Sequence, residues 1–252
     1  MSITLDFSGK QVWVTGAGRG IGYDIACRFT EAGAIVTGFD RVFSSDALAF
    51  RTIELDIGDA AAVAKVCARE LAHTPHLDVL VNGAGILRMG QTEALSQQDW
   101  QDCLNVNAGG AFHLFQALIP QFQRQRRGAI VSIGSNAAHV PRVGMAAYCA
   151  SKAALRSLCL TVGLELAPYG VRCNLVSPGS TDTPMQRSLW HSPESERHTI
   201  AGFPEQFKLG IPLGKIARPR DITDTVLFLA SDLASHITLQ DMVIDGGATL
   251  GA

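Results

Sequence analysis

The chain contains 252 residues, of which 47% are hydrophobic and 17% are charged, a balance typical of a folded globular protein rather than a disordered one. The formal net charge of −2 leaves no basic field for nucleic acid or for an anionic membrane surface. No stretch approaches the roughly 18 uninterrupted apolar residues of a membrane span, so we expect neither nucleic acid nor a membrane as a partner.

Short apolar runs alternate with longer helical patterns along the chain. The runs predict strands at 12–15, 35–39, 52–55, 78–82, 129–133, 171–177 and 242–245. The patterns between them predict helices near 20–32, 59–73, 97–126, 149–168 and 219–230. Ser96-x-x-Asp99 resembles a capping box, and Pro219 fits a first helical turn. The alternation predicts one α/β domain over residues 1–252, with a Rossmann-type, doubly wound parallel sheet flanked by helices.

The least regular segment runs from about residue 180 to residue 215. It contains Pro184, Pro193, Pro204 and Pro212. The segment is long for a simple connection in a compact domain, so we interpret it as a substrate-binding loop or lid.

A glycine-rich turn follows the first predicted strand directly and opens the first predicted helix. Its residues are Gly16, Ala17, Gly18, Arg19, Gly20, Ile21 and Gly22. Glycine permits a tight turn and close approach to a pyrophosphate, and a helix N-terminus favours negative charge. The turn therefore predicts a dinucleotide site, with all of these residues except Ala17 as candidates for binding it.

Asp40 ends the second predicted strand, where a carboxylate can accept hydrogen bonds from an adenosine ribose. A carboxylate there repels a 2′-phosphate and favours NAD. Arg19 and Arg41 favour NADP, because both can approach that phosphate. We give Asp40 more weight, since arginine side chains can turn to solvent, and we predict NAD as the cofactor.

Tyr148 and Lys152 are four residues apart, a spacing that places both on one face of a helix. A nearby ammonium favours the phenolate and lowers the pKa of tyrosine. The pair can then take a proton from an alcohol. A chance i,i+4 pair is the alternative, and only the remaining motifs argue against it.

These motifs together resemble the short-chain dehydrogenase/reductase family. The resemblance covers essentially the whole chain, and the residues that carry it are Thr15-Gly16-x-x-x-Gly20-x-Gly22, Asn82-Gly83-Ala84-Gly85, Asn107, Ser135, Tyr148-x-x-x-Lys152 and Pro178-Gly179-x-x-x-Thr183. One small departure is Gly83, where the family often has Asn or Ala.

The resemblance implies a role for each matched residue. Tyr148 is the general base or acid, Lys152 lowers its pKa and holds the nicotinamide ribose, Ser135 binds the substrate oxygen, and Asn107 supports a proton path through Lys152. Further cofactor contacts are expected from Asn82, Asp56, Pro178, Gly179 and Thr183. Members of the family usually form tetramers or dimers through their long helices, and we expect a homotetramer.

Longer segments outside these motifs, including 207–219 and 235–241, resemble one branch of the family. That resemblance implies a small anionic cyclic diol as substrate, one alcohol of which is oxidised. A carboxylate on the substrate calls for a cation in the pocket, and Arg88 and Arg142 are the candidates. Met185, with Met89 and Met145, is a candidate for lining the ring pocket, although methionine often only fills gaps.

Two alternatives stay open at this point. The first is an enzyme of the same family that acts on another cyclic alcohol or on a 3-oxoacyl thioester. The second is a non-catalytic NAD-binding regulator, although a pure binder needs no proton relay.

The six cysteines form no C-x-x-C pair, and none lies near a histidine at metal-ligand spacing. We expect no metal site and interpret the cysteines as reduced residues in the core. The first residues show no basic region followed by an apolar run. These features predict a cytoplasmic protein.

Overall fold

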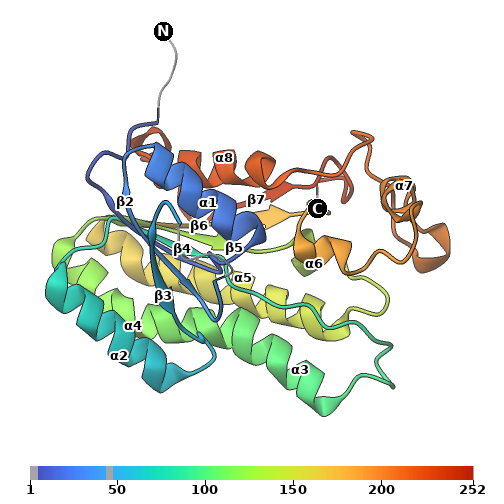
Figure 1. The fold of residues 1–252 in the computed structure, drawn as a ribbon, viewed down its shortest axis with the longest axis horizontal. Helices are drawn as coiled ribbons and strands as arrows, with labels where there is room; N and C mark the ends of the chain where they lie inside the picture. Colours follow the sequence, from blue (N-terminus) through green and yellow to red (C-terminus); the bar gives the residue numbers. More distant parts are fainter. Residues whose placement is uncertain (1–4, 44–47, 252) are drawn as a thin grey trace, which may run out of the picture.

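The computed structural model describes residues 5–43 and 48–251, and its centre is a seven-stranded sheet in the order β3-β2-β1-β4-β5-β6-β7 (Figure 1). The strands are β1 (Gln11–Thr15), β2 (Ile35–Asp40), β3 (Arg51–Glu54), β4 (Val79–Asn82), β5 (Gly128–Ile133), β6 (Val171–Pro178) and β7 (Asp241–Ile244). All neighbouring strands are parallel. The chain winds outward in both directions from β1 and β4, which confirms the predicted doubly wound sheet.

Helices cover both faces of the sheet (Figure 1). One layer holds α1 (Gly20–Glu31) and α8 (Pro219–Ala230), and the other holds α2 (Ala60–His73), α4 (Gly110–Gln125) and α5 (Ala146–Leu166). The remaining helices are α3 (Gln97–Leu104), α6 (Pro184–Arg187) and α7 (Ser195–Ala201). Short turns of other helix types complete the set: Asn105–Gly109 (η1), Asn136–Ala138 (η2), Ala167–Tyr169 (η3), Pro204–Gln206 (η4) and Asp232–Ala234 (η5).

The strands separate two hydrophobic cores because successive side chains point to opposite faces. In β1, Val12 and Val14 pack in the core that includes Ile25 of α1, whereas Trp13 packs in the core under α4 and α5. Both faces of the strand are therefore buried, which explains its continuous apolar run.

Two predicted helices differ from the observed ones. The helix expected over 97–126 is interrupted by the π-helical turn η1 (Asn105–Gly109) between α3 and α4. A π turn adds one residue without breaking the helical pattern, so periodicity does not reveal it. The helix expected over 149–168 begins earlier, at Ala146, and so includes Tyr148. Ser96 caps α3 by accepting a hydrogen bond from the amide of Asp99 (3.0 Å), and Pro219 begins α8, both as predicted.

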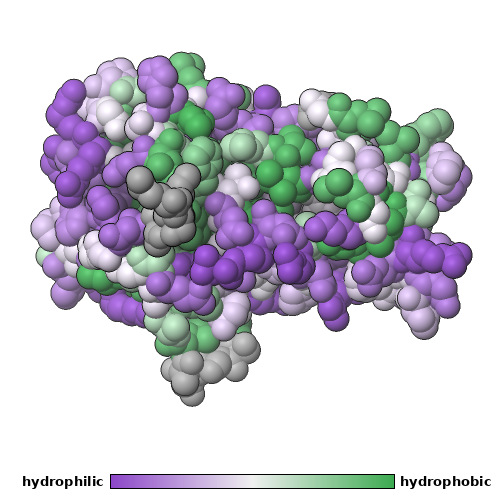
Figure 2. Space-filling model, turned by 90° about the horizontal axis from the view of Figure 1, so that it is seen from above, coloured by the Kyte–Doolittle hydropathy of each residue, from purple (hydrophilic) through white to green (hydrophobic). Residues whose placement is uncertain are grey.

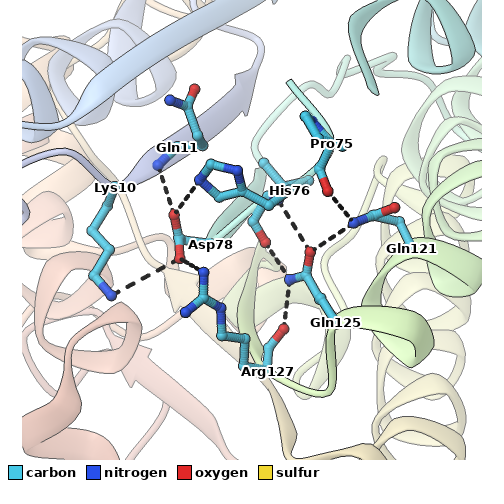
Figure 3. Close-up of polar contacts among 9 residues, drawn as sticks. Lys10, Gln11, Pro75, His76, Asp78, Gln121, Gln125 and Arg127 are labelled. Atoms are coloured by element: carbon cyan, nitrogen blue, oxygen red, sulfur yellow. Dashed lines mark hydrogen bonds and ion pairs between the residues drawn. The ribbon is translucent and has the colours of Figure 1, made fainter. Parts of the chain in front are cut away.

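A polar network at the amino ends of β1, β4 and β5 ties the strands together (Figure 3). The carboxylate of Asp78 accepts a hydrogen bond from the Gln11 amide (2.9 Å) and lies within 4 Å of the charged groups of Lys10 and Arg127 (3.9 and 3.7 Å). Beside it, the Gln125 side chain donates to the Leu77 carbonyl (2.6 Å). These contacts lie at the opposite edge of the sheet from the strand ends described below.

Within the described ranges, no helix is both long and apolar enough to cross a membrane. All six cysteines are free, and four of them (Cys67, Cys103, Cys159 and Cys173) are buried.

Candidate functional site

A cavity of about 280 Å³ lies at the carboxyl ends of the strands. It brings together most of the candidate residues. Those that line it are Gly16, Arg19, Gly20, Ile21, Gly22, Asp40, Asp56, Ser135, Arg142, Tyr148, Lys152, Pro178, Gly179, Thr183 and Met185. Residues from six separate segments thus meet where ligands of doubly wound sheets bind.

One end of the cavity has the features of a dinucleotide cradle. Gly16 has a positive φ of 74°, and a Cβ at Gly22 would come within 2.2 Å of the Gly16 carbonyl oxygen. Only glycine therefore allows this turn to close onto α1. Arg19, at the N-cap of α1, makes no side-chain capping bond, so N–H groups of the first helical turn remain available to an anion. The residues present fit a pyrophosphate.

Two carboxylates line the same end of the cavity. Asp40 accepts hydrogen bonds from the amides of Gly18 (2.9 Å, to Oδ2) and Arg41 (2.7 Å, to Oδ1). Each oxygen retains a second lone pair for a ribose hydroxyl. Asp56 accepts a hydrogen bond from the Gly58 amide (2.9 Å), so it caps its own turn as well as facing the cavity. The end of the cavity that would hold adenosine is thus rich in hydrogen-bond acceptors.

Tyr148 lies in the first turn of α5, facing Ser135 at the end of β5. Burial raises the pKa of Tyr148, and the hydroxyl of Ser135 opposes that rise. The expected lowering of this pKa is therefore not observed, because desolvation of the phenolate outweighs the favourable polar contact. Ser135 is fixed in turn, since its Oγ accepts a hydrogen bond from the Ala137 amide (3.1 Å).

Lys152 is 4% exposed and donates a hydrogen bond to the carbonyl of Ile133 (2.8 Å). Its Nζ lies 5.8 Å from the centre of the Tyr148 ring. Burial lowers the pKa of Lys152 to about 8, so the side chain is charged at neutral pH. A cation held beside a phenol favours the phenolate, and this pair can accept a proton from a hydroxyl group placed against Ser135.

Asn107 lies in the π turn, not on the wall of the cavity. Its Oδ1 accepts from the amide of Ile86 (2.8 Å), and its Nδ2 donates to the Ile86 carbonyl and to Ser151 Oγ (both 2.9 Å). Ile86 itself lines the cavity. In this structure Asn107, which belongs to the π turn, therefore holds a wall of the site in place.

Three other predicted residues lie behind or outside the cavity wall. The amide of Gly18 donates a hydrogen bond to the carboxylate of Asp40. Asn82 is buried, and its Oδ1 accepts a hydrogen bond from the hydroxyl of Thr15 (3.4 Å). That hydroxyl in turn accepts hydrogen bonds from the amides of the loop after Asn82. Arg88 is paired with carboxylates of α3, Asp99 (3.0 Å) and Asp102 (3.5 Å), so its charge is already balanced away from the cavity.

Arg142 lines the cavity and forms no ion pair with any described residue. Burial lowers its pKa. Met145 and Met185 line the same cavity, whereas Met89 does not. The sequence reasoning missed Lys208, a second cation on this wall. It comes from the irregular segment, where no periodic pattern marks a side chain as facing inward.

The surface near this end of the molecule is apolar. Figure 2 shows hydrophobic residues gathered at the end that carries α6 and α7. Large exposed apolar side chains of the segment are Met185, Phe207, Leu209 and Leu213.

Known proteins resemble this chain in sequence and in fold. A family model described as enoyl-(acyl carrier protein) reductase matches residues 16–249. The chain is 67% identical to 2,3-dihydro-2,3-dihydroxybenzoate dehydrogenase of Escherichia coli (strain K12), over 98% of this chain and 100% of that one. It is 44% identical to the enzyme of the same name from Bacillus subtilis (strain 168), over 96% and 97% of the two chains. A solved short chain dehydrogenase/reductase family protein superposes with a TM-score of 0.83 at 33% identity, over 96% and 97%. The chain therefore belongs to the short-chain dehydrogenase/reductase family.

Proposed function

We propose that this protein oxidises 2,3-dihydro-2,3-dihydroxybenzoate to 2,3-dihydroxybenzoate with NAD, a step of catechol siderophore biosynthesis. The observation that carries the proposal is a single cavity that joins a dinucleotide cradle, the Tyr148–Lys152 pair and an unpaired cation, Arg142. Relatives with the matching name extend over nearly the full chain. Family enzymes use a nicotinamide cofactor, and Asp40 favours NAD because its charge repels a 2′-phosphate.

The positions of the side chains support a catalytic role for each of four residues. Ser135 donates a hydrogen bond to the oxygen of the reacting alcohol, and Tyr148, as phenolate, takes its proton. Lys152 stabilises the phenolate and binds a cofactor ribose. Asn107 positions Ile86, which lines the cavity, through two hydrogen bonds. The nicotinamide, when bound, supplies the acceptor for the hydride.

The substrate end of the site fits a small anion. Arg142 presents a half-buried guanidinium that forms no ion pair with a described carboxylate, although the charge of Asp245 acts on it from farther away. Met145 and Met185 offer apolar surface for a ring. We assign the substrate carboxylate to Arg142 rather than to Arg88, whose partners are on α3. The segment 180–215, with α6 and α7, serves as the lid over this end.

We further propose a cytoplasmic homotetramer. Phe112 on α4 and Leu164 on α5 are 49% and 64% exposed, which is unusual for large apolar side chains on long helices. Pairing of these helices between subunits would cover them. Light scattering at the mass of four chains would support the proposal, and a monomer would contradict it.

The activity test is NADH formation from the dihydrodiol, followed at 340 nm, with the product identified by catechol fluorescence. An acetoacetyl thioester with NADH or NADPH serves as the competing substrate. Turnover of the dihydrodiol above that of the thioester is expected. Turnover of the thioester alone would replace the proposal by a reductase role, and cofactor binding without turnover of either would indicate a non-catalytic protein.

A further inference from the structure

Arg142 and Lys208 are two cations on the wall of one cavity. They come from distant parts of the chain, the turn before α5 and the loop after α7. The pKa of Lys208 is lowered by burial and, next, by the charge of Arg142, so the two groups are close enough to repel one another. Neither forms an ion pair with any residue in the described part of the chain. Asp245 attracts Arg142, but from beyond ion-pair distance. Two half-buried like charges with no carboxylate in direct contact are costly, and such arrangements cluster at functional sites.

The backbone holds Lys208 firmly in this place. Lys208 and Phe203 exchange both backbone hydrogen bonds (2.8 and 3.1 Å), which closes a small hairpin. At its base, a Cβ on Gly202 would come within 2.5 Å of the Gly210 nitrogen, so two glycines allow the strands of the hairpin to touch. The Lys208 ammonium also lies 5.2 Å from the centre of the Phe203 ring. The hairpin thus fixes the backbone at Lys208, whose side chain lines the cavity.

The backbone also fixes the turn that carries Arg142. Its carbonyl accepts a hydrogen bond from the Met145 amide (3.2 Å), in the turn that leads directly into α5 and Tyr148. The phosphate-binding end of the cavity has its own donors at the start of α1, with Arg19. The charges of Arg142 and Lys208 are therefore not needed by the cofactor cradle.

We propose that Lys208 and Arg142 together bind the carboxylate of the substrate, and that Lys208 makes the enzyme select an acidic cyclic diol over a neutral one. This inference rests on the proposed function. Arginine offers a planar fork for both carboxylate oxygens, and lysine adds a compact second charge. A bound carboxylate relieves the repulsion between the two cations.

The test compares KM for the dihydrodiol carboxylate with KM for the same diol lacking the carboxylate. The variants are Lys208→Met, Lys208→Gln and Lys208→Arg, with Lys215→Met as the matched control, because Lys215 is exposed in the same segment and does not line the cavity. Both neutral variants should raise KM for the acid about 10- to 100-fold and leave KM for the neutral diol unchanged. Lys208→Arg should retain most of the selectivity, and Lys215→Met all of it. Equal changes for the two diols would overturn the inference.

A binding measurement separates failure of this inference from failure of the proposed function. Benzoate should raise the melting temperature of the wild type and of Lys215→Met more than that of Lys208→Met. This holds even if the wild type oxidises neither diol, a result that would refute the proposed function alone. The same rise in all three proteins would show that Lys208 does not bind carboxylate.

Discussion

The ammonium of Lys152 lies 5.8 Å from the centre of the Tyr148 ring, one turn further along α5. Its hydrogen bond to the Ile133 carbonyl (2.8 Å) ties that turn to the end of β5. The same sheet edge carries Ser135, so the helix and the strand fix the phenol, the ammonium and the serine hydroxyl relative to one another. Such fixed geometry is what general base catalysis requires.

Replacement of Tyr148 by phenylalanine removes the proton acceptor and little else. We expect Tyr148→Phe to lower kcat by roughly 10²- to 10⁴-fold, with the Kd of NAD nearly unchanged. Because burial raises the pKa of Tyr148, wild-type oxidation should accelerate as pH rises above neutral, whereas the variant should lose that dependence. Steady-state kinetics from pH 6 to 10 and cofactor titration check both points. Near-normal turnover in the variant would refute the assignment.

The pKa of Lys152 links pH to the stability of the fold. The native pKa is about 8, below the ordinary value of 10.5, so between these values the unfolded chain binds more protons than the native one. Stability contributed by this residue must therefore rise with pH across that window, by roughly 3 kcal/mol at most. Relative to Lys152→Met, the wild type should gain free energy of unfolding between pH 8 and pH 10.5, as measured by urea denaturation. A constant difference between the two proteins would contradict the lowered pKa.

The two arginines should differ in their effect on substrate binding. Arg142→Ala should raise KM for the carboxylate substrate about 10- to 100-fold, because its guanidinium lines the cavity without a partner. Arg88→Ala should leave KM nearly unchanged, since Arg88 is paired with Asp99 and Asp102 on α3. Kinetics with the acid and with a neutral cyclic diol distinguish the two positions. The reverse order of effects would place the carboxylate beside α3.

Asp40 should set the choice between NAD and NADP. Asp40→Asn keeps the shape of the side chain and removes the charge that would face a 2′-phosphate. The ratio of kcat/KM for NAD over NADP should then fall about tenfold or more, because one repulsive charge pair is lost. Asp56→Asn is the matched comparison at the same end of the cavity. A wild-type preference for NADP would defeat this interpretation at once.

Asp78 should matter for stability and not for catalysis. It is 10% exposed in its side chain and joins the starts of β1, β4 and β5, at the edge of the sheet opposite the cavity (Figure 3). Asp78→Ala should lower the free energy of unfolding by about 2 to 4 kcal/mol and leave KM unchanged. Lys10→Ala, at 3.9 Å from this carboxylate, should cost less than about 0.5 kcal/mol. Equal losses of unfolding free energy in the two variants would mean that the buried contacts of Asp78 do not stabilise the fold.

The doubly wound sheet, the glycine turn and the Tyr148–Lys152 pair could be predicted from the sequence, because they depend on local periodicity and on short motifs. All seven strands were predicted close to their observed bounds. The π turn at Asn105–Gly109 was not, since it alters hydrogen bonding without altering the apolar pattern. Asn107, which contacts Ile86, lies in that turn.

Which cations face the cavity could not be predicted from the sequence. Arg88 and Arg142 look alike in the sequence, yet α3 supplies carboxylates to the first and nothing among the described residues pairs with the second. Lys208 stands in an irregular segment and shares the cavity wall with Arg142, which lies 66 residues earlier in the chain. The rise in the pKa of Tyr148 could not be predicted either, because burial depends on all the residues packed around the ring. Motifs specify chemistry locally, whereas burial, charge pairing and long-range contact exist only in the folded chain.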